Sequence, residues 1–384
     1  MSTASHPFRD LRLFSGLPQY ENFANMKRLV PVSAMQPSQM PRPWPSGDPI
    51  ELPESFEVDG DSRSVQEMLA RTGTVALLVL RDGAVRFEQY WHTGGPDVQW
   101  TSMSVAKSFV SAMVGMLVDD GSIPDIDAPI SDTISVEPGS AYDGVAIRDV
   151  LLMSSGARWN EDYSDPDSDV LRFTPASEPG GEGLDAFIAH MQKEFEPGTV
   201  CRYCSGDTQA LGMLLRAASG RTLTELMQER IMGPLGMEQP GYWWVDPFGV
   251  ELAAGGLLLT ARDFARLGEL YRQGGMWDGT RILSEAWVRD STRVTAPQCS
   301  PERMAASGGT PGLGYGYQWW LPTNDHGAYS AIGVYNQFVF VDPVTSTTIV
   351  KLSANPAYGT TTDPALDAEE ETMAFLLALA AREF

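Results

Sequence analysis

Apolar residues at both ends of the chain follow the patterns of β-strands. Residues 74–80 and 84–91 are two β-rich runs separated by Arg81-Asp82-Gly83, a turn sequence that predicts a hairpin. Three more β-rich runs cover residues 315–322, 330–343 and 346–354, and residues 342–345 predict the turn between the last two. Residues 366–384 follow with a pattern that predicts a terminal helix.

The middle of the chain shows helical spacing of its apolar residues, interrupted by long loops. The pattern predicts helices over residues 100–121, 147–153, 207–218 and 223–232. Another begins after Thr260, an N-cap with Asp263 three residues on. Strands at both ends predict one antiparallel sheet flanked by helices, with a mostly helical part inserted. The absence of a serial β-α-β alternation disfavours a doubly wound nucleotide-binding fold.

These patterns predict an α/β (α+β) protein with three segments. Residues 1–60 are rich in proline and should form an extended arm over the surface. Residues 61–103 and 246–384 should form an α/β lobe with the antiparallel sheet, and residues 104–245 a mostly helical lobe. The active site is expected between the two lobes.

Charge and cysteine content narrow the classes of partner and compartment. The formal net charge of −23 over 384 residues argues against nucleic acid or an anionic membrane. No run approaches the roughly 18 uncharged apolar residues of a membrane-spanning helix. The start lacks a basic segment followed by an apolar run, so we expect no secretory signal. An odd count of three cysteines suits a reducing compartment, and we expect a cytoplasmic protein.

Lys107 is one of four lysines and follows Ser104 by three residues in an otherwise apolar predicted helix. Residues three apart share a helix face, so the two side chains can touch. With Thr101 or Ser102 as N-cap, Ser104 falls in the first turn, where the helix end favours an alkoxide. On a dry face, desolvation lowers the pKa of Lys107, and its neutral amine can take the Ser104 proton. A lysine that reaches solvent near a helix end is the alternative.

Tyr203 lies where a short extended run meets the helix predicted from about Asp207. A tyrosine at such a junction can aim its hydroxyl into a cleft. Beside a lysine ammonium its pKa should fall, which would make it a proton shuttle. A half-buried tyrosine bonded to water is the alternative.

The two pieces together, in this order and at this separation, resemble the serine β-lactamase and penicillin-binding-protein superfamily. Within it, the chain is similar to class C β-lactamases, β-lactamase-like esterases and, most closely, 6-aminohexanoate-dimer hydrolases. The resemblance runs from about Thr74 to the C-terminus. It rests on DDGSIPDIDAPISD, IRDVLLMSSG, EPGTVCRYCSGDTQAL, GPLGM and AAGGLLLTARDFARLGEL. It implies a β-lactamase/transpeptidase-like fold and a serine hydrolase.

The resemblance also implies residue roles. Ser104 would be the acylating nucleophile, Lys107 its base, and Tyr203 the group that passes protons between Ser104 and the leaving atom. The oxyanion hole in such enzymes uses the backbone N–H of the nucleophile and one from a sheet-edge strand, for which Val334 is the matching donor. Ser205, two residues after the tyrosine, is a candidate substrate-binding residue.

Two further stretches bear on substrate preference. The third family motif, normally Lys-Thr-Gly or His-x-Gly, reads Val-Tyr-Asn-Gln over residues 334–337. Tyr335 becomes a candidate substrate-binding residue, while the missing cation and glycine weigh against β-lactamase as the main activity. Tyr163 lies in WNEDYSDPDSD, which resembles the loop of 6-aminohexanoate-dimer hydrolases whose tyrosine lines the substrate cleft. An acidic surface loop with a packed aromatic residue is the alternative.

No motif indicates a cofactor or a metal. Cys201 and Cys204 form C-x-x-C, but neither a βαβ context nor two further zinc ligands accompany them, so we expect buried or cleft-lining thiols. We therefore predict a cofactor-free serine hydrolase for a small-molecule ester or linear amide, with a homodimer as one possible assembly. A β-lactamase or D-amino-acid-specific peptidase using the same three residues is one alternative. A non-catalytic binding protein with this fold is the other.

Overall fold

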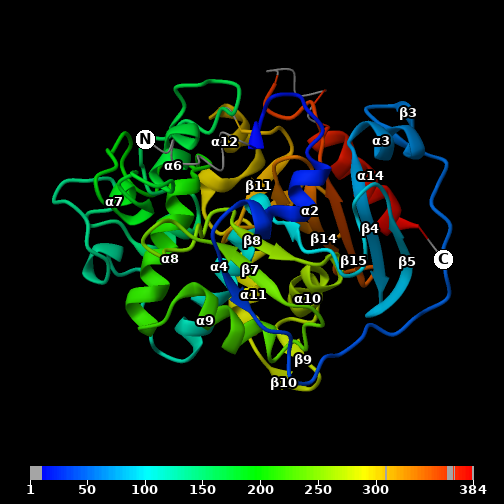
Figure 1. Ribbon diagram of the computed structural model, residues 1–384, viewed down its shortest axis with the longest axis horizontal. Coiled ribbons are helices and arrows are strands. Elements are labelled where there is room, and N and C mark those ends of the chain that lie inside the picture. The colour runs from blue at the N-terminus through cyan, green and yellow to red at the C-terminus, as the bar shows by residue number, and fades with distance from the viewer. Residues whose placement is uncertain (1–10, 308, 361–365, 367, 383–384) are drawn as a thin grey trace.

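Strands from both ends of the chain form one large sheet. The computed structural model describes residues 11–307, 309–360, 366 and 368–382. Within these residues, seven strands pair antiparallel in the order β11-β12-β13-β14-β15-β4-β5. In Figure 1 the early strands β4 and β5 lie beside the late strands β14 and β15. The strands are β11 (Leu313–Tyr315), β12 (Trp320–Pro322), β13 (Tyr329–Gly333), β14 (Gln337–Asp342), β15 (Thr347–Ser353), β4 (Thr74–Arg81) and β5 (Ala84–Tyr90).

Both faces of this sheet are buried, because a core lies against each face. Side chains alternate between the two faces along each strand. On β4, Leu78 and Leu80 face a large apolar core that includes helix α10 (Ala261–Arg272). Leu77 and Val79 face a smaller core under helix α14 (Glu369–Ala381). This burial on both sides explains why β4, the first strand of the hairpin, is almost continuously apolar. The fold class predicted from the sequence is confirmed.

The helical part of the chain stands beside the sheet (Figure 1). It is centred on the packed pair α4 (Ala106–Asp119) and α8 (Ser205–Ser219). The other described helices are α2 (Tyr20–Leu29), α3 (Val65–Arg71), α5 (Ile147–Leu151), α6 (Asp169–Ala176), α7 (Leu184–Ala189), α9 (Leu223–Met227), α11 (Glu285–Ser291) and α12 (Pro301–Ala306). Single turns are η1 (Met103–Val105), η2 (Ile130–Asp132), η3 (Gln228–Met232) and η4 (Pro297–Cys299).

A small antiparallel sheet joins the two parts, and the sequence did not predict it. Its order is β1-β7-β8-β6, with β1 (Val32–Met35), β7 (Gly241–Trp244), β8 (Leu257–Leu259) and β6 (Trp100–Thr101). Two short hairpins complete the strands: β2 (Ser55–Val58) with β3 (Asp61–Ser64), and β9 (Met276–Trp277) with β10 (Thr280–Arg281). The lobe division stays a prediction, and β7 and β8 pair across its boundary at 245/246.

Two details of the sequence prediction are corrected. Residues 330–343, taken as one β-rich run, form β13 and β14 with a tight turn at residues 334–336, where Tyr335 and Asn336 have positive φ. The segment 1–60, taken as an extended arm, contains α2 and strand β1, which pairs with β7; residues 1–10 lie outside the described part. Phe23 and Met26 of α2 are fully buried, so core packing overrides the proline-rich composition around them. No helix among the described residues is both long and apolar enough to cross a membrane.

Candidate active site

Ser104 and Lys107 lie at the junction of η1 and α4. Lys107 Nζ donates a hydrogen bond to Ser104 Oγ at 2.9 Å, as their spacing on one helix face predicts. The expected side-chain cap is absent. Thr101 belongs to β6, and the Ser102 hydroxyl donates instead to the carbonyls of Met103 and Gly255.

Lys107 is 2% exposed, and three groups surround its amine. Besides Ser104, Nζ donates to Ser205 Oγ at 3.1 Å and to the Ala254 carbonyl at 2.7 Å. Burial lowers the pKa of Lys107 to about 8, and the Glu161 carboxylate opposes that shift. A neutral amine has two N–H donors, which Ser205 and Ala254 can hold, and its lone pair is then available to the Ser104 hydroxyl.

Tyr203 lies in the loop before α8, and its ring packs against Lys107. Lys107 Nζ lies 5.1 Å from the ring centroid, and the ring of Trp320 stacks on it at 5.2 Å. The expected fall of the Tyr203 pKa is wrong. Burial and then the Glu161 carboxylate raise it well above its ordinary value, while the Ser104 hydroxyl partly offsets this. The phenol therefore keeps its proton at neutral pH, and the resting site holds a phenol and not a phenolate.

Glu161, which was not predicted as a site residue, connects three candidate residues. Its carboxylate accepts a hydrogen bond from Ser205 Oγ at 2.7 Å and from the Tyr163 hydroxyl at 2.8 Å. Ser205 in turn accepts from Lys107, so a polar chain runs from Tyr163 to the buried amine. Nothing in the sequence distinguishes Glu161 from the other acids of WNEDYSDPDSD, since only the fold turns it inward.

The turn between β13 and β14 approaches the nucleophile candidate. A Cβ on Gly333 would lie 2.9 Å from the Ser104 backbone nitrogen, so only glycine leaves that N–H accessible. Val334 follows and lines the same cavity as Ser104. It lies in a turn after an inner strand, and not on a sheet-edge strand as expected. The Gln337 amide holds this turn by donating to the carbonyls of Val334 and Tyr335.

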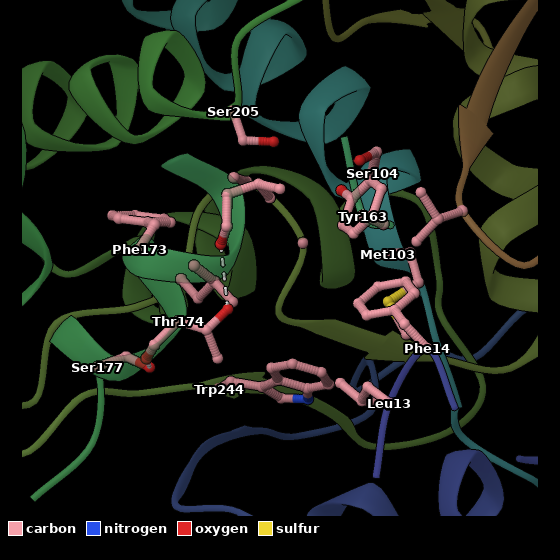
Figure 2. Close-up of a pocket in the computed structure, with 15 residues that line it drawn as sticks. Leu13, Phe14, Met103, Ser104, Tyr163, Phe173, Thr174, Ser177, Ser205 and Trp244 are labelled. Atoms are coloured by element: carbon pink, nitrogen blue, oxygen red, sulfur yellow. Dashed lines mark hydrogen bonds between the residues drawn. The ribbon is translucent and has the colours of Figure 1, made fainter. Parts of the chain in front are cut away.

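Four of the seven candidate residues line one cavity: Ser104, Tyr163, Ser205 and Val334. Figure 2 shows this cavity with Ser104, Tyr163 and Ser205 labelled. Tyr203 lines an adjoining recess together with Trp159, Glu161 and Trp320. Tyr335 lines neither. It is 1% exposed and its hydroxyl accepts the Phe14 N–H at 2.7 Å, so it supports the N-terminal segment and does not face substrate.

The three cysteines, Cys201, Cys204 and Cys299, are free and buried. Within the part of the chain that the structure describes, no group of three or more His, Cys, Asp or Glu side chains could hold a metal ion.

Together, an antiparallel sheet covered on both faces and a buried lysine bonded to a serine at a helix start define a protein of the serine β-lactamase and penicillin-binding-protein class. Comparison with known proteins gives the family. Residues 62–371 match the family model described as Beta-lactamase, and the chain belongs to this family.

Individual relatives agree with this placement. The chain is 31% identical over 373 residues to a 6-aminohexanoate-dimer hydrolase of Paenarthrobacter ureafaciens, covering 92% of this chain and 93% of the relative. A solved structure named "Putative 6-aminohexanoate-dimer hydrolase from Bacillus anthracis" superposes with a TM-score of 0.82 at 23% identity, over 94% of this chain and 95% of that one. A family VIII carboxylesterase superposes with a TM-score of 0.57 at 16% identity, over 81% and 96%. The fold is that of β-lactamases, and the relatives' names support hydrolase activity.

Proposed function

We propose that the chain is a serine hydrolase that cleaves carboxylic esters or linear amides through an acyl-serine intermediate. The observation that carries this proposal is the contact of 2.9 Å between Lys107 Nζ and Ser104 Oγ, beside a cavity that Ser104 lines. With the pKa of Lys107 at about 8, a useful fraction of the amine is neutral near neutral pH. Ser104 is then the nucleophile and Lys107 its base.

In the acylation step, Ser104 Oγ attacks the substrate carbonyl carbon while its proton passes to Lys107. The carbonyl oxygen becomes an oxyanion, which the N–H groups of Ser104 and Val334 stabilise. When the C–O or C–N bond breaks, Tyr203 gives its proton to the leaving atom. The proton held by Lys107 then restores the phenol. Water repeats the sequence on the acyl-serine and releases the acid.

Support for esters and linear amides over β-lactams comes from the turn at residues 334–337. Its side chains are Val, Tyr, Asn and Gln, none of which offers a cation to a penicillin carboxylate. The full-length relative named as a 6-aminohexanoate-dimer hydrolase supports a linear amide as one substrate class.

The test is a panel of substrates given to the parent and to Ser104→Ala. p-Nitrophenyl acetate and butyrate, nitrocefin and the linear 6-aminohexanoate dimer should separate the candidate activities. We expect turnover of the esters, the amide or both, weaker turnover of nitrocefin, and loss of all activity in Ser104→Ala. A kcat/KM higher for nitrocefin than for the acetate ester would favour a β-lactamase. Activity that survives in Ser104→Ala would exclude this site.

A further inference from the structure

The cavity beside Ser104 is lined mainly by apolar side chains, with hydroxyl groups as its polar atoms. None of the described residues that line it carries a charge. Figure 2 shows its walls, which include Met103, Phe173 and Trp244. Its volume is about 90 Å³, several times the minimum that one water molecule needs.

The hydroxyl groups in the wall, apart from that of Ser104, are bonded to the protein itself. Thr174 Oγ1 donates to the Val170 carbonyl at 3.3 Å, and Ser177 Oγ donates to the Thr174 carbonyl at 2.7 Å. Ser205 Oγ donates to Glu161 at 2.7 Å. These hydroxyl protons are therefore not directed at a ligand, and the wall offers a bound group mainly apolar contact.

The N-terminal segment supplies one side of this cavity, through Leu13 and Phe14. The ring of Phe14 lies 4.5 Å from that of Tyr163 and 5.3 Å from that of Tyr335, measured between centroids. Phe14 has φ of 59°, a conformation that costs a bulky residue free energy unless its surroundings hold it there. The bond from its N–H to the Tyr335 hydroxyl and the two ring contacts hold it. A Cβ on Gly359 would lie 2.4 Å from the ring, so glycine there makes room for it.

The position of Tyr203 decides which half of a substrate enters this cavity. If Tyr203 protonates the leaving atom, the leaving group must lie on its side of Ser104. That side is the recess lined by Trp159, Glu161 and Trp320. The acyl chain must then occupy the apolar cavity that Ser104 lines.

We propose that this cavity is an acyl-chain site that selects an uncharged, apolar acyl group, with Phe14 as a specificity-determining residue. This inference rests on the proposed acyl-serine function. An acyl chain that ends in an ammonium group would lose its hydration among these walls without gaining a charged partner. An alkyl chain of equal length gains from the same burial.

The test compares two esters with one leaving group and matched chain length, p-nitrophenyl heptanoate and the p-nitrophenyl ester of 6-aminohexanoic acid, at pH 7. We expect kcat/KM to be at least about tenfold higher for heptanoate. Equal values, or preference for the amino ester, would overturn the inference. Preference for the amino ester would require a charged partner for its ammonium group, such as Glu178 or Asp246 in the adjoining cavity.

Phe14→Ala tests the residue itself, with Leu17→Ala as the control from the same segment, since Leu17 is 41% exposed. Phe14→Ala should lower kcat/KM for heptanoate about tenfold and leave p-nitrophenyl acetate within about twofold, whereas Leu17→Ala should change neither. A thermal melt of each variant checks folding. Equal loss on both esters would mean that Phe14 only supports the fold, and would refute its role in selecting the acyl chain.

If acetate turns over through Ser104 without any chain selectivity, only this inference fails. Should no ester or amide turn over, the proposed function fails with it.

Discussion

Lys107 and Lys351 are two buried lysines that each donate a hydrogen bond to a serine. Lys107 reaches Ser104 at 2.9 Å on α4, and Lys351 reaches Ser353 at 2.6 Å on β15. Lys351 is 0% exposed, and its amine also donates to Thr72 Oγ1 at 3.1 Å. Burial lowers the pKa of Lys107 to about 8 and that of Lys351 to about 7. The serine bond, the burial and the pKa alone would make Lys351 as good a candidate for a general base as Lys107, with a larger neutral fraction at pH 7.

Access and surroundings separate the two pairs. Ser104 is 8% exposed and lines a cavity, whereas Ser353 is 0% exposed between the sheet and the helices over it. The Lys107 pair continues through Ser205 to Glu161 and Tyr163, while the Lys351 pair ends at the hydroxyls of Thr72 and Thr74. A lowered lysine pKa therefore reports a dry environment. Chemistry additionally requires that a substrate reach the serine.

The largest expected difference between the pairs is in covalent labelling. A fluorophosphonate should modify Ser104, because it lines the cavity, and should not modify Ser353. Ser104→Ala should remove the label and lower kcat/KM about 10³-fold or more, whereas Ser353→Ala should keep both. Peptide mapping after intact-mass analysis locates the label, and a label on Ser353 would end the comparison.

Replacing each lysine by methionine, which has a similar length, should separate the pairs next. Lys107→Met removes the base for Ser104 and should lower kcat by about 10²-fold or more. Lys351→Met should leave kcat within about twofold, since nothing on the path from substrate to Ser104 contacts it. Steady-state ester hydrolysis measures both, and comparable losses would show that Lys351 acts on the site through the sheet.

A Tyr163 variant tests whether the chain of hydrogen bonds from Lys107 to Tyr163 reaches the substrate. Its hydroxyl donates to Glu161, so its oxygen can still accept the N–H of an amide substrate. An ester has no such hydrogen. Tyr163→Phe should therefore cost about 1–3 kcal/mol, roughly 5- to 150-fold, on amide hydrolysis and only a few-fold on esters. Equal losses on the two substrates would make Tyr163 a packing residue only.

Lys351 should affect stability where Lys107 affects turnover. Its pKa of about 7 in the folded chain lies below its ordinary 10.5, so between these pH values the unfolded chain binds more protons. Its destabilising contribution is thus full below pH 7 and fades as pH rises toward 10.5. Lys351→Met should raise the free energy of unfolding by about 1–4 kcal/mol below pH 7, with a smaller gain at pH 9 to 10.

The hydroxyls left behind in Lys351→Met keep partners, since Thr72 donates to the Met68 carbonyl at 2.9 Å. Urea denaturation at several pH values measures the difference between this variant and the parent. A gain independent of pH would mean that packing, and not desolvation of the amine, sets the effect.

The smallest effect is expected from Glu161, whose charge is near Lys107. The carboxylate favours the ammonium form of Lys107, which also faces Ser104, Ser205, Cys204 and Tyr203. Glu161→Gln should therefore lower the pKa of Lys107 and move the acid limb of the kcat/KM profile to lower pH, by less than about one pH unit. Glu194→Gln is the control, because Glu194 pairs with Arg202 at the surface. An unmoved acid limb would show that Glu161 only holds Ser205 and Tyr163.

Local patterns in the sequence were sufficient for part of this protein. The two-sided apolar run of β4, the N-cap Thr260 and the spacing of Ser104 and Lys107 are all short-range features, and each appears in the structure. Such features depend on backbone geometry over a few residues, so the order of residues alone determines them. The family motifs added the placement of Tyr203 beside this pair.

Other properties depended on contacts between segments far apart in the sequence. Glu161 becomes part of the site only because its loop packs against the start of α8, and Phe14 only because the N-terminal segment crosses the cavity. The rise in the Tyr203 pKa and the burial of Lys351 follow from the loss of water around them, which the tertiary structure alone decides. In a sequence Lys351 resembles any strand lysine, because the helices that exclude water from it lie about 280 residues earlier and 20 residues later in the chain.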